Sequence, residues 1–179
     1  MRSYLRYTIT LLALILLLAP VLVSANPSDT DLTNAEKRVQ KALKKMPYYS
    51  VFDNIEFEIS NSTVTLTGKV WRAFLKSEAE AVILALEEVT QVNNQIEILP
   101  LSSRDDRLRV AAARAVFSNP FLSRYAAGAR PSIHIIVERG KIILEGVVRN
   151  ETDRNVAGIE ARGVNGAFAV ENNLRWEVS

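Results

Sequence analysis

The sequence predicts an α+β protein that consists of two tandem copies of one small αββαβ unit, preceded by a cleaved leader. The main observation is a repeat: residues 55–70 and 133–148 carry the same pattern of apolar residues and glycine, 78 positions apart. In each copy, a helical pattern of apolar residues precedes this segment and another follows it. Two repeats of this size predict two domains rather than a solenoid. We place the first at residues 26–100 and the second at residues 101–179.

Residues 1–25 have the features of a secretory signal peptide. Arg2 and Arg6 precede an apolar stretch, and small residues at 23–25 offer a cleavage position after Ala25. The apolar stretch from 9 to 23 has 15 residues, fewer than the roughly 20 that a membrane-spanning helix needs. We therefore expect cleavage and export to the periplasm, with a retained membrane anchor as the alternative.

Charge is distributed unevenly between the two repeats. Residues 26–100 contain 8 Lys and Arg against 11 Asp and Glu, whereas residues 101–179 contain 12 against 9. This modest imbalance favours docking of the two units on each other, or contact of the second unit with an anionic surface. We expect no nucleic-acid partner. The chain has no cysteine, so disulfides and a lipid-modified cysteine are excluded.

The first helix of each unit is predicted from apolar residues on one face. In the first unit these are Leu32, Ala35, Val39 and Leu43, and Pro47 ends the helix. The counterpart runs from about Asp105 to Ser118. If the spacing of 78 holds there too, Val110, Ala113 and Phe117 face the second core.

The repeated segment predicts a β-hairpin. Residues 55–59 alternate apolar and acidic, 60–62 form a turn, and 64–70 alternate again. A glycine interrupts the inward row of the second strand in both copies, at Gly68 and Gly146, which indicates a bulge or a close packing contact. An amphipathic helix and a third strand follow. Each unit is thus predicted as a three-stranded mixed sheet with two helices on one face, in which the third strand runs parallel to a neighbour.

Both copies resemble the BON domain family. The resemblance is carried by Ile55–Gly68 (IEFEISNSTVTLTG) with Val92–Ile96, and by Ile133–Gly146 (IHIIVERGKIILEG) with Val170–Leu174. It implies an αββαβ fold, an envelope or periplasmic location, phospholipid binding, and a role in envelope integrity under osmotic stress. One departure is that the family's glycine before the last strand is absent from the first unit, whereas the second unit has Gly166.

Candidate lipid-contact residues lie on and after the first helix of the second unit. Opposite its predicted core face, that helix carries Leu108, Ala112 and Ala115, with arginines on the flanks. Apolar residues flanked by arginine suit anionic headgroups, and the resemblance implicates the second domain in lipid contact. The alternative is that Leu108 packs against the other domain and that the alanines only favour helix formation. The candidates are Arg104, Arg107, Leu108, Arg114, Arg124, Tyr125 and Arg130.

A second candidate surface is the open face of the second sheet. Ile136, Ile143 and Val147 are predicted to point outward, where the first unit has polar residues. Such an apolar face should be covered. We expect the cover to be the first unit or a partner chain, rather than lipid.

The sequence gives no indication of catalysis. It contains one histidine, His134, and no cysteine, so a metal site of the usual His and Cys ligands cannot be completed. The family has no catalytic motif to transfer. We therefore expect no cofactor and a non-enzymatic envelope protein that binds phospholipid peripherally. The alternative is a protein-interaction module that docks a periplasmic partner or self-associates through the apolar sheet face of the second unit.

Overall fold

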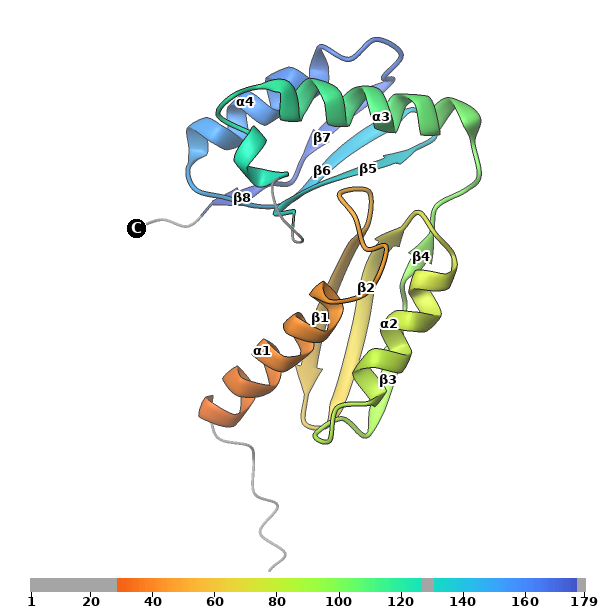
Figure 1. The fold of residues 1–179 in the computed structure, drawn as a ribbon, viewed down its shortest axis with the longest axis vertical. Coiled ribbons are helices and arrows are strands. Elements are labelled where there is room, and N and C mark those ends of the chain that lie inside the picture. The colour runs from red at the N-terminus through yellow and green to blue at the C-terminus, as the bar shows by residue number, and fades with distance from the viewer. Residues whose placement is uncertain (1–28, 127–130, 177–179) are drawn as a thin grey trace, which may run out of the picture.

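The computed structural model describes residues 29–126 and 131–176, which form two units that each consist of one sheet and two helices (Figure 1). In both units the two helices cover the same face of the sheet. The expected α+β class and the αββαβ order are confirmed. The predicted leader lies outside the described residues.

In the first unit the chain forms α1 (Asp29–Lys44), β1 (Asn54–Ser60), β2 (Thr63–Val70), α2 (Phe74–Leu84), β3 (Gln91–Asn94) and β4 (Glu97–Ile98). β2 is central: it pairs antiparallel with β1 and parallel with both β3 and β4. The third strand of the prediction is therefore present, interrupted between β3 and β4. Because β3 and β4 lie on the far side of β2, β1 forms one edge of the sheet.

The second unit repeats this order with α3 (Ser103–Ser118), a 3-10 turn (Ser123–Tyr125), β5 (Ile133–Glu138), β6 (Lys141–Val148), α4 (Glu151–Arg162), β7 (Ala169–Asn172) and β8 (Arg175–Trp176). β6 is central, β5 is the antiparallel edge strand, and β7 and β8 run parallel to β6.

The structure corrects the predicted face of α3. Its buried row is Leu108, Ala112 and Val116, whereas Val110 is 51% exposed. Ala112 and Val116 correspond to the buried Ala35 and Val39 of α1 at a spacing of 77 rather than 78. The second unit thus has one extra residue between its first helix and first strand, and one residue turns a helix by roughly 100°.

The repeated glycine makes a close packing contact, one of the two alternatives that its place in the strand indicated. Gly68 has φ +105° and Gly146 has φ +114°. A Cβ atom at Gly68 would lie 2.2 Å from the Asn54 carbonyl oxygen, and one at Gly146 would lie 2.1 Å from the Ser132 carbonyl oxygen. Only a residue without a side chain fits at these points of the hairpins.

The two units contact each other through the loop between α1 and β1. The Val51 carbonyl accepts a hydrogen bond of 2.6 Å from the Ile135 amide on the edge of β5. Phe52 packs on the second core, and Tyr49 lies 5.7 Å from the His134 ring. Lys69 on β2 forms an ion pair of 2.5 Å with Glu138.

Arg109 of α3 extends this contact. It is 1% exposed, pairs with Asp106, and donates a hydrogen bond of 3.1 Å to the Val137 carbonyl. Its guanidinium lies 5.1 Å from the Trp71 ring centroid and 6.0 Å from that of Phe52. A cation of the second unit is therefore placed against two aromatic rings of the first.

Candidate functional site

The outward side of α3 and the turn that follows it form the strongest candidate surface. Arg107, Val110 and Arg114 are exposed and lie three to four residues apart, so they share one side of the helix. Phe121, just beyond the helix, is 62% exposed. We call Arg107, Val110, Arg114 and Phe121 the outer strip. It combines two exposed apolar side chains with two cations.

The rotation of α3 is fixed by contacts at its N-terminus. The Ser102 hydroxyl caps the helix by accepting a hydrogen bond of 3.2 Å from the Asp105 amide. The buried Asp105 carboxylate accepts hydrogen bonds of 2.8 Å from the amides of Arg139 and Gly140 in the β5–β6 turn. Since these contacts tie α3 to the sheet, the outer strip has to face away from the core.

The charges of Arg107 and Arg114 are not neutralised by ion pairs with other described residues. Among the described residues, Arg107 and Arg114 take part in no ion pair and no hydrogen bond. Nearby Arg124 donates to the Phe121 carbonyl at 2.8 Å, and its guanidinium lies 5.8 Å from the Tyr125 ring centroid. The side chain of Arg124 is exposed, so its charge adds to that of the strip.

Two predicted lipid-contact residues are wrong, because the structure buries them. Leu108 is 4% exposed in the second core, as the one-residue shift of α3 requires. Tyr125 is 6% exposed; its hydroxyl donates to the Asp153 carboxylate and accepts a hydrogen bond of 3.0 Å from the Arg149 amide. Burial, followed by the bond to Asp153, raises the pKa of Tyr125. Neither side chain can reach a headgroup.

Of the remaining candidates, Arg104 lies away from the outer strip, and the position of Arg130 is not described. Arg104 is exposed near the start of α3 and donates a hydrogen bond of 3.4 Å to the Gly166 carbonyl, at the opposite end of the helix from Phe121. Arg130 lies outside the described residues. Sequence reasoning missed Val110 as a surface residue, because the assumed spacing of 78 assigned it to the core.

The three predicted interface residues do not form one exposed patch. Ile136 is 2% exposed, Ile143 is half-buried, and Val147 is 38% exposed. The neighbours of Ile136 in β5 contact the first unit: His134 meets Tyr49 and Ile135 meets Val51. Ile136 is therefore inaccessible to a partner chain while the two units are joined.

Comparison with known proteins identifies the family. Residues 31–100 and 121–177 match the model of the BON domain. The chain belongs to the BON family. The second match begins after α3, although α3 occupies the place that α1 has in the first unit. BON proteins are typically periplasmic or membrane-associated, bind membranes or partner proteins, and are generally not enzymes.

Two solved structures are similar to this chain. One is the C-terminal domain of CdsD, a structural protein of the type III secretion system of Chlamydia trachomatis, with 14% identity, a TM-score of 0.34, and coverage of 85% of this chain and 100% of that one. A second structure of CdsD has 12% identity, a TM-score of 0.33, and coverage of 82% and 93%. No curated protein matches the chain.

Across residues 29–126 and 131–176, the structure contains no helix with the length and apolar character needed to cross a membrane. Within those same ranges, no three His, Cys, Asp or Glu side chains are grouped so as to hold a metal ion.

Proposed function

We propose that this BON protein is a non-enzymatic periplasmic protein that binds anionic phospholipid peripherally through the outer strip of α3. The single observation that carries the proposal is the pairing of exposed Val110 and Phe121 with the uncompensated Arg107 and Arg114. Apolar groups can enter the boundary between headgroups and acyl chains while arginines hold phosphate. Removal of residues 1–25 and a role in envelope integrity under osmotic stress belong to the same proposal.

The geometry favours a peripheral position over a deep one. Two apolar residues, Val110 on α3 and Phe121 just beyond it, bury little area in lipid, so the attraction between arginine and phosphate has to supply much of the binding free energy. Such binding requires anionic lipid and weakens as salt screens the charges. A protein-docking role for Ile136, Ile143 and Val147 has less support, because Ile136 is buried.

The test is flotation of residues 26–179 with vesicles of neutral or anionic phospholipid at low and moderate salt. We expect flotation with anionic vesicles that decreases as salt is raised. The double variant Arg107→Glu and Arg114→Glu should lose it, as should Val110→Ser with Phe121→Ser. The matched control is Lys37→Glu with Lys41→Glu, which makes the same charge change at exposed positions of α1.

Flotation that is equal for neutral and anionic vesicles would contradict the proposal. So would equal losses in the α3 and α1 charge variants, because binding would then follow net charge rather than the outer strip.

A further inference from the structure

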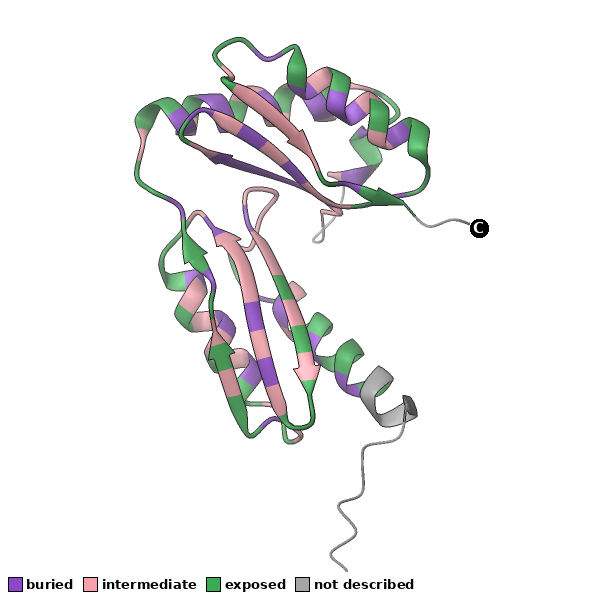
Figure 2. Cartoon of the chain, turned by 180° about the vertical axis from the view of Figure 1, so that it is seen from behind, coloured by how far each residue is buried: buried purple, intermediate pink, exposed green. Residues whose placement is uncertain are grey.

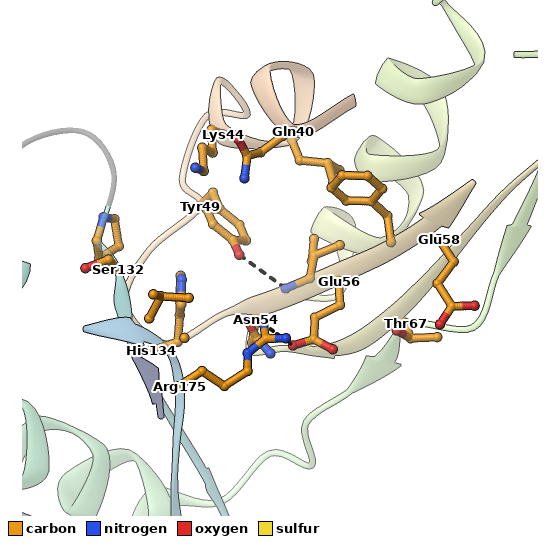
Figure 3. A pocket seen from close by; sticks show the side chains of 16 residues that line it. Gln40, Lys44, Tyr49, Asn54, Glu56, Glu58, Thr67, Ser132, His134 and Arg175 are labelled. Atoms are coloured by element: carbon orange, nitrogen blue, oxygen red, sulfur yellow. Dashed lines mark hydrogen bonds and ion pairs between the residues drawn. The ribbon is translucent and has the colours of Figure 1, made fainter. Parts of the chain in front are cut away.

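A groove of about 460 Å³ lies between the free edge of β1 and the second unit (Figure 3). Five consecutive residues of β1, Asn54–Glu58, line one side of it, and Ser132, His134 and Arg175 line the other. Because consecutive strand residues point to opposite faces of a sheet, a lining of this kind means that the groove follows the backbone edge of β1. The question is whether that edge can bind another strand.

The backbone edge of β1 carries unpaired hydrogen-bonding groups. A two-residue turn joins Ser60 to Thr63, and this closing pair is hydrogen-bonded in such hairpins. By alternation, the amides and carbonyls of Phe57 and Ile59 point away from β2. Within the described residues, no hydrogen bond reaches them on that side. At Ile55 the amide already donates to the Tyr49 hydroxyl at 3.2 Å.

In the second unit, backbone groups on the corresponding edge, that of β5, already have hydrogen-bond partners. Ile135 and Val137 correspond to Phe57 and Ile59 at the spacing of 78. The Ile135 amide donates to the Val51 carbonyl at 2.6 Å, and the Val137 carbonyl accepts from Arg109 at 3.1 Å. In the second unit the partners of this edge are therefore the Val51 carbonyl, in a turn of the α1–β1 loop, and the Arg109 side chain. Within the described residues, no group takes their place beside Phe57 and Ile59.

Burial differs between the two copies in the same sense. Ile133, Ile135 and Val137 of β5 are at most 1% exposed. Their counterparts Ile55, Phe57 and Ile59 are only half-buried. Figure 2 shows β5 buried almost throughout and β1 alternating between intermediate and exposed. The apolar row of β1 is therefore incompletely covered at its edge, and an added strand would complete it.

We propose that the free edge of β1 binds an extended peptide of a partner protein by strand addition, and that this peptide alternates apolar and basic residues. Its apolar side chains would extend the row of Ile55, Phe57 and Ile59. Its basic side chains would lie beside Glu56 and Glu58, which are exposed on the other face. Main-chain hydrogen bonds supply affinity in this mode, and alternate side chains supply specificity.

A second copy of this chain is a poorer occupant of the edge. Antiparallel pairing of two β1 strands about Phe57 would place Glu56 of each copy opposite Glu58 of the other, and like charges directly opposite are destabilising. Arg175 forms a weak ion pair with Glu56 of β1: the two groups lie 3.8 Å apart, and both side chains are more than half exposed (Figure 3). A lysine or arginine of a peptide can therefore replace it.

The test uses residues 26–179 with a heptapeptide that alternates lysine and valine. We expect the Phe57 and Ile59 amides to exchange with solvent about tenfold more slowly when the peptide is bound. The double variant Glu56→Lys and Glu58→Lys should bind this peptide about tenfold more weakly and prefer a glutamate–valine peptide. The control, Glu87→Lys with Glu151→Lys, makes the same charge change at exposed positions outside the groove and should leave binding unchanged.

Backbone methylation separates strand addition from attraction by charge. One peptide carries N-methyl groups on its valines and another on its lysines. Since one edge of the peptide faces β1, one of the two should lose binding and the other keep it. Binding of both methylated peptides, absence of protection at Phe57 and Ile59, or a dimer that protects these amides without peptide would each overturn the proposal.

Discussion

At the scale of single residues, Asp105 has the clearest structural role. Its buried carboxylate accepts both amides of the β5–β6 turn, where Arg139 has φ +50° and Gly140 has φ +79°. Asp105→Ala leaves these two donors without an acceptor, which should cost about 1–3 kcal/mol of unfolding free energy. Asp105→Asn keeps one carboxamide oxygen and should cost less. Urea unfolding of the three proteins checks this; equal stability of the alanine and asparagine variants would contradict it.

His134 should make stability depend on pH. It is 8% exposed, its Nδ1 has no hydrogen-bond partner within the described residues, and burial lowers its pKa below the usual 6.5. The unfolded chain therefore takes up a proton at a higher pH than the folded one. The resulting stability is present above pH 6.5 and is lost as pH falls through the window between the two pKa values.

The variant His134→Phe keeps a ring beside Tyr49 and removes the titration. Between about pH 7.5 and 5.5, we expect the unfolding free energy of the natural chain to fall more than that of the variant. Parallel slopes in denaturant titrations at the two pH values would show that His134 is not the group responsible.

At the scale of elements, the hairpin glycines should be far less replaceable than a glycine in open space. Gly68→Ala and Gly146→Ala combine a positive φ with a Cβ within 2.2 Å of a carbonyl oxygen. Gly166 also has a positive φ, +93°, but a Cβ there meets nothing within 4 Å. Gly166→Ala should lower the unfolding free energy by about 1–2 kcal/mol. Gly68→Ala and Gly146→Ala should lower it clearly more. Thermal unfolding of the three variants compares them directly.

Some features of the helices and strands could be predicted from the sequence, and others could not. Strand alternation, the strand glycines and the crossover are local signals, so the hairpins and the parallel third strands followed from the residues alone. The face of α3 did not, because a helix can be rotated by one inserted residue without changing its apolar composition. Apolar residues occur on both sides of α3, Val110 and Phe117 as well as Leu108 and Val116. Burial of Asp105 against the β5–β6 turn, which fixes the rotation, is a long-range contact.

The whole molecule depends on contacts that the sequence did not reveal. No local sequence pattern predicts that Arg109 and the loop at 48–53 contact each other. In the structure they meet: the Val51 carbonyl bonds to β5, and the Arg109 guanidinium lies near the rings of both Trp71 and Phe52. The sequence predicts that the apolar face of the second sheet is covered. The residues of that face differ in exposure: Ile136 is buried, while Val147 is exposed and borders the groove.

These contacts should make the two units unfold together. Each unit is near the lower size limit for an independent core, and an arginine over an aromatic ring contributes about 0.5–2 kcal/mol. We expect one calorimetric transition for the natural chain and two for Arg109→Ala, which removes the cation from both rings and the donor from Val137. Arg38→Ala is the control, because its ion pair with Glu88 lies within the first unit. A single transition in Arg109→Ala, merely shifted to lower temperature, would mean that Val51 and the Lys69–Glu138 pair suffice to couple the units.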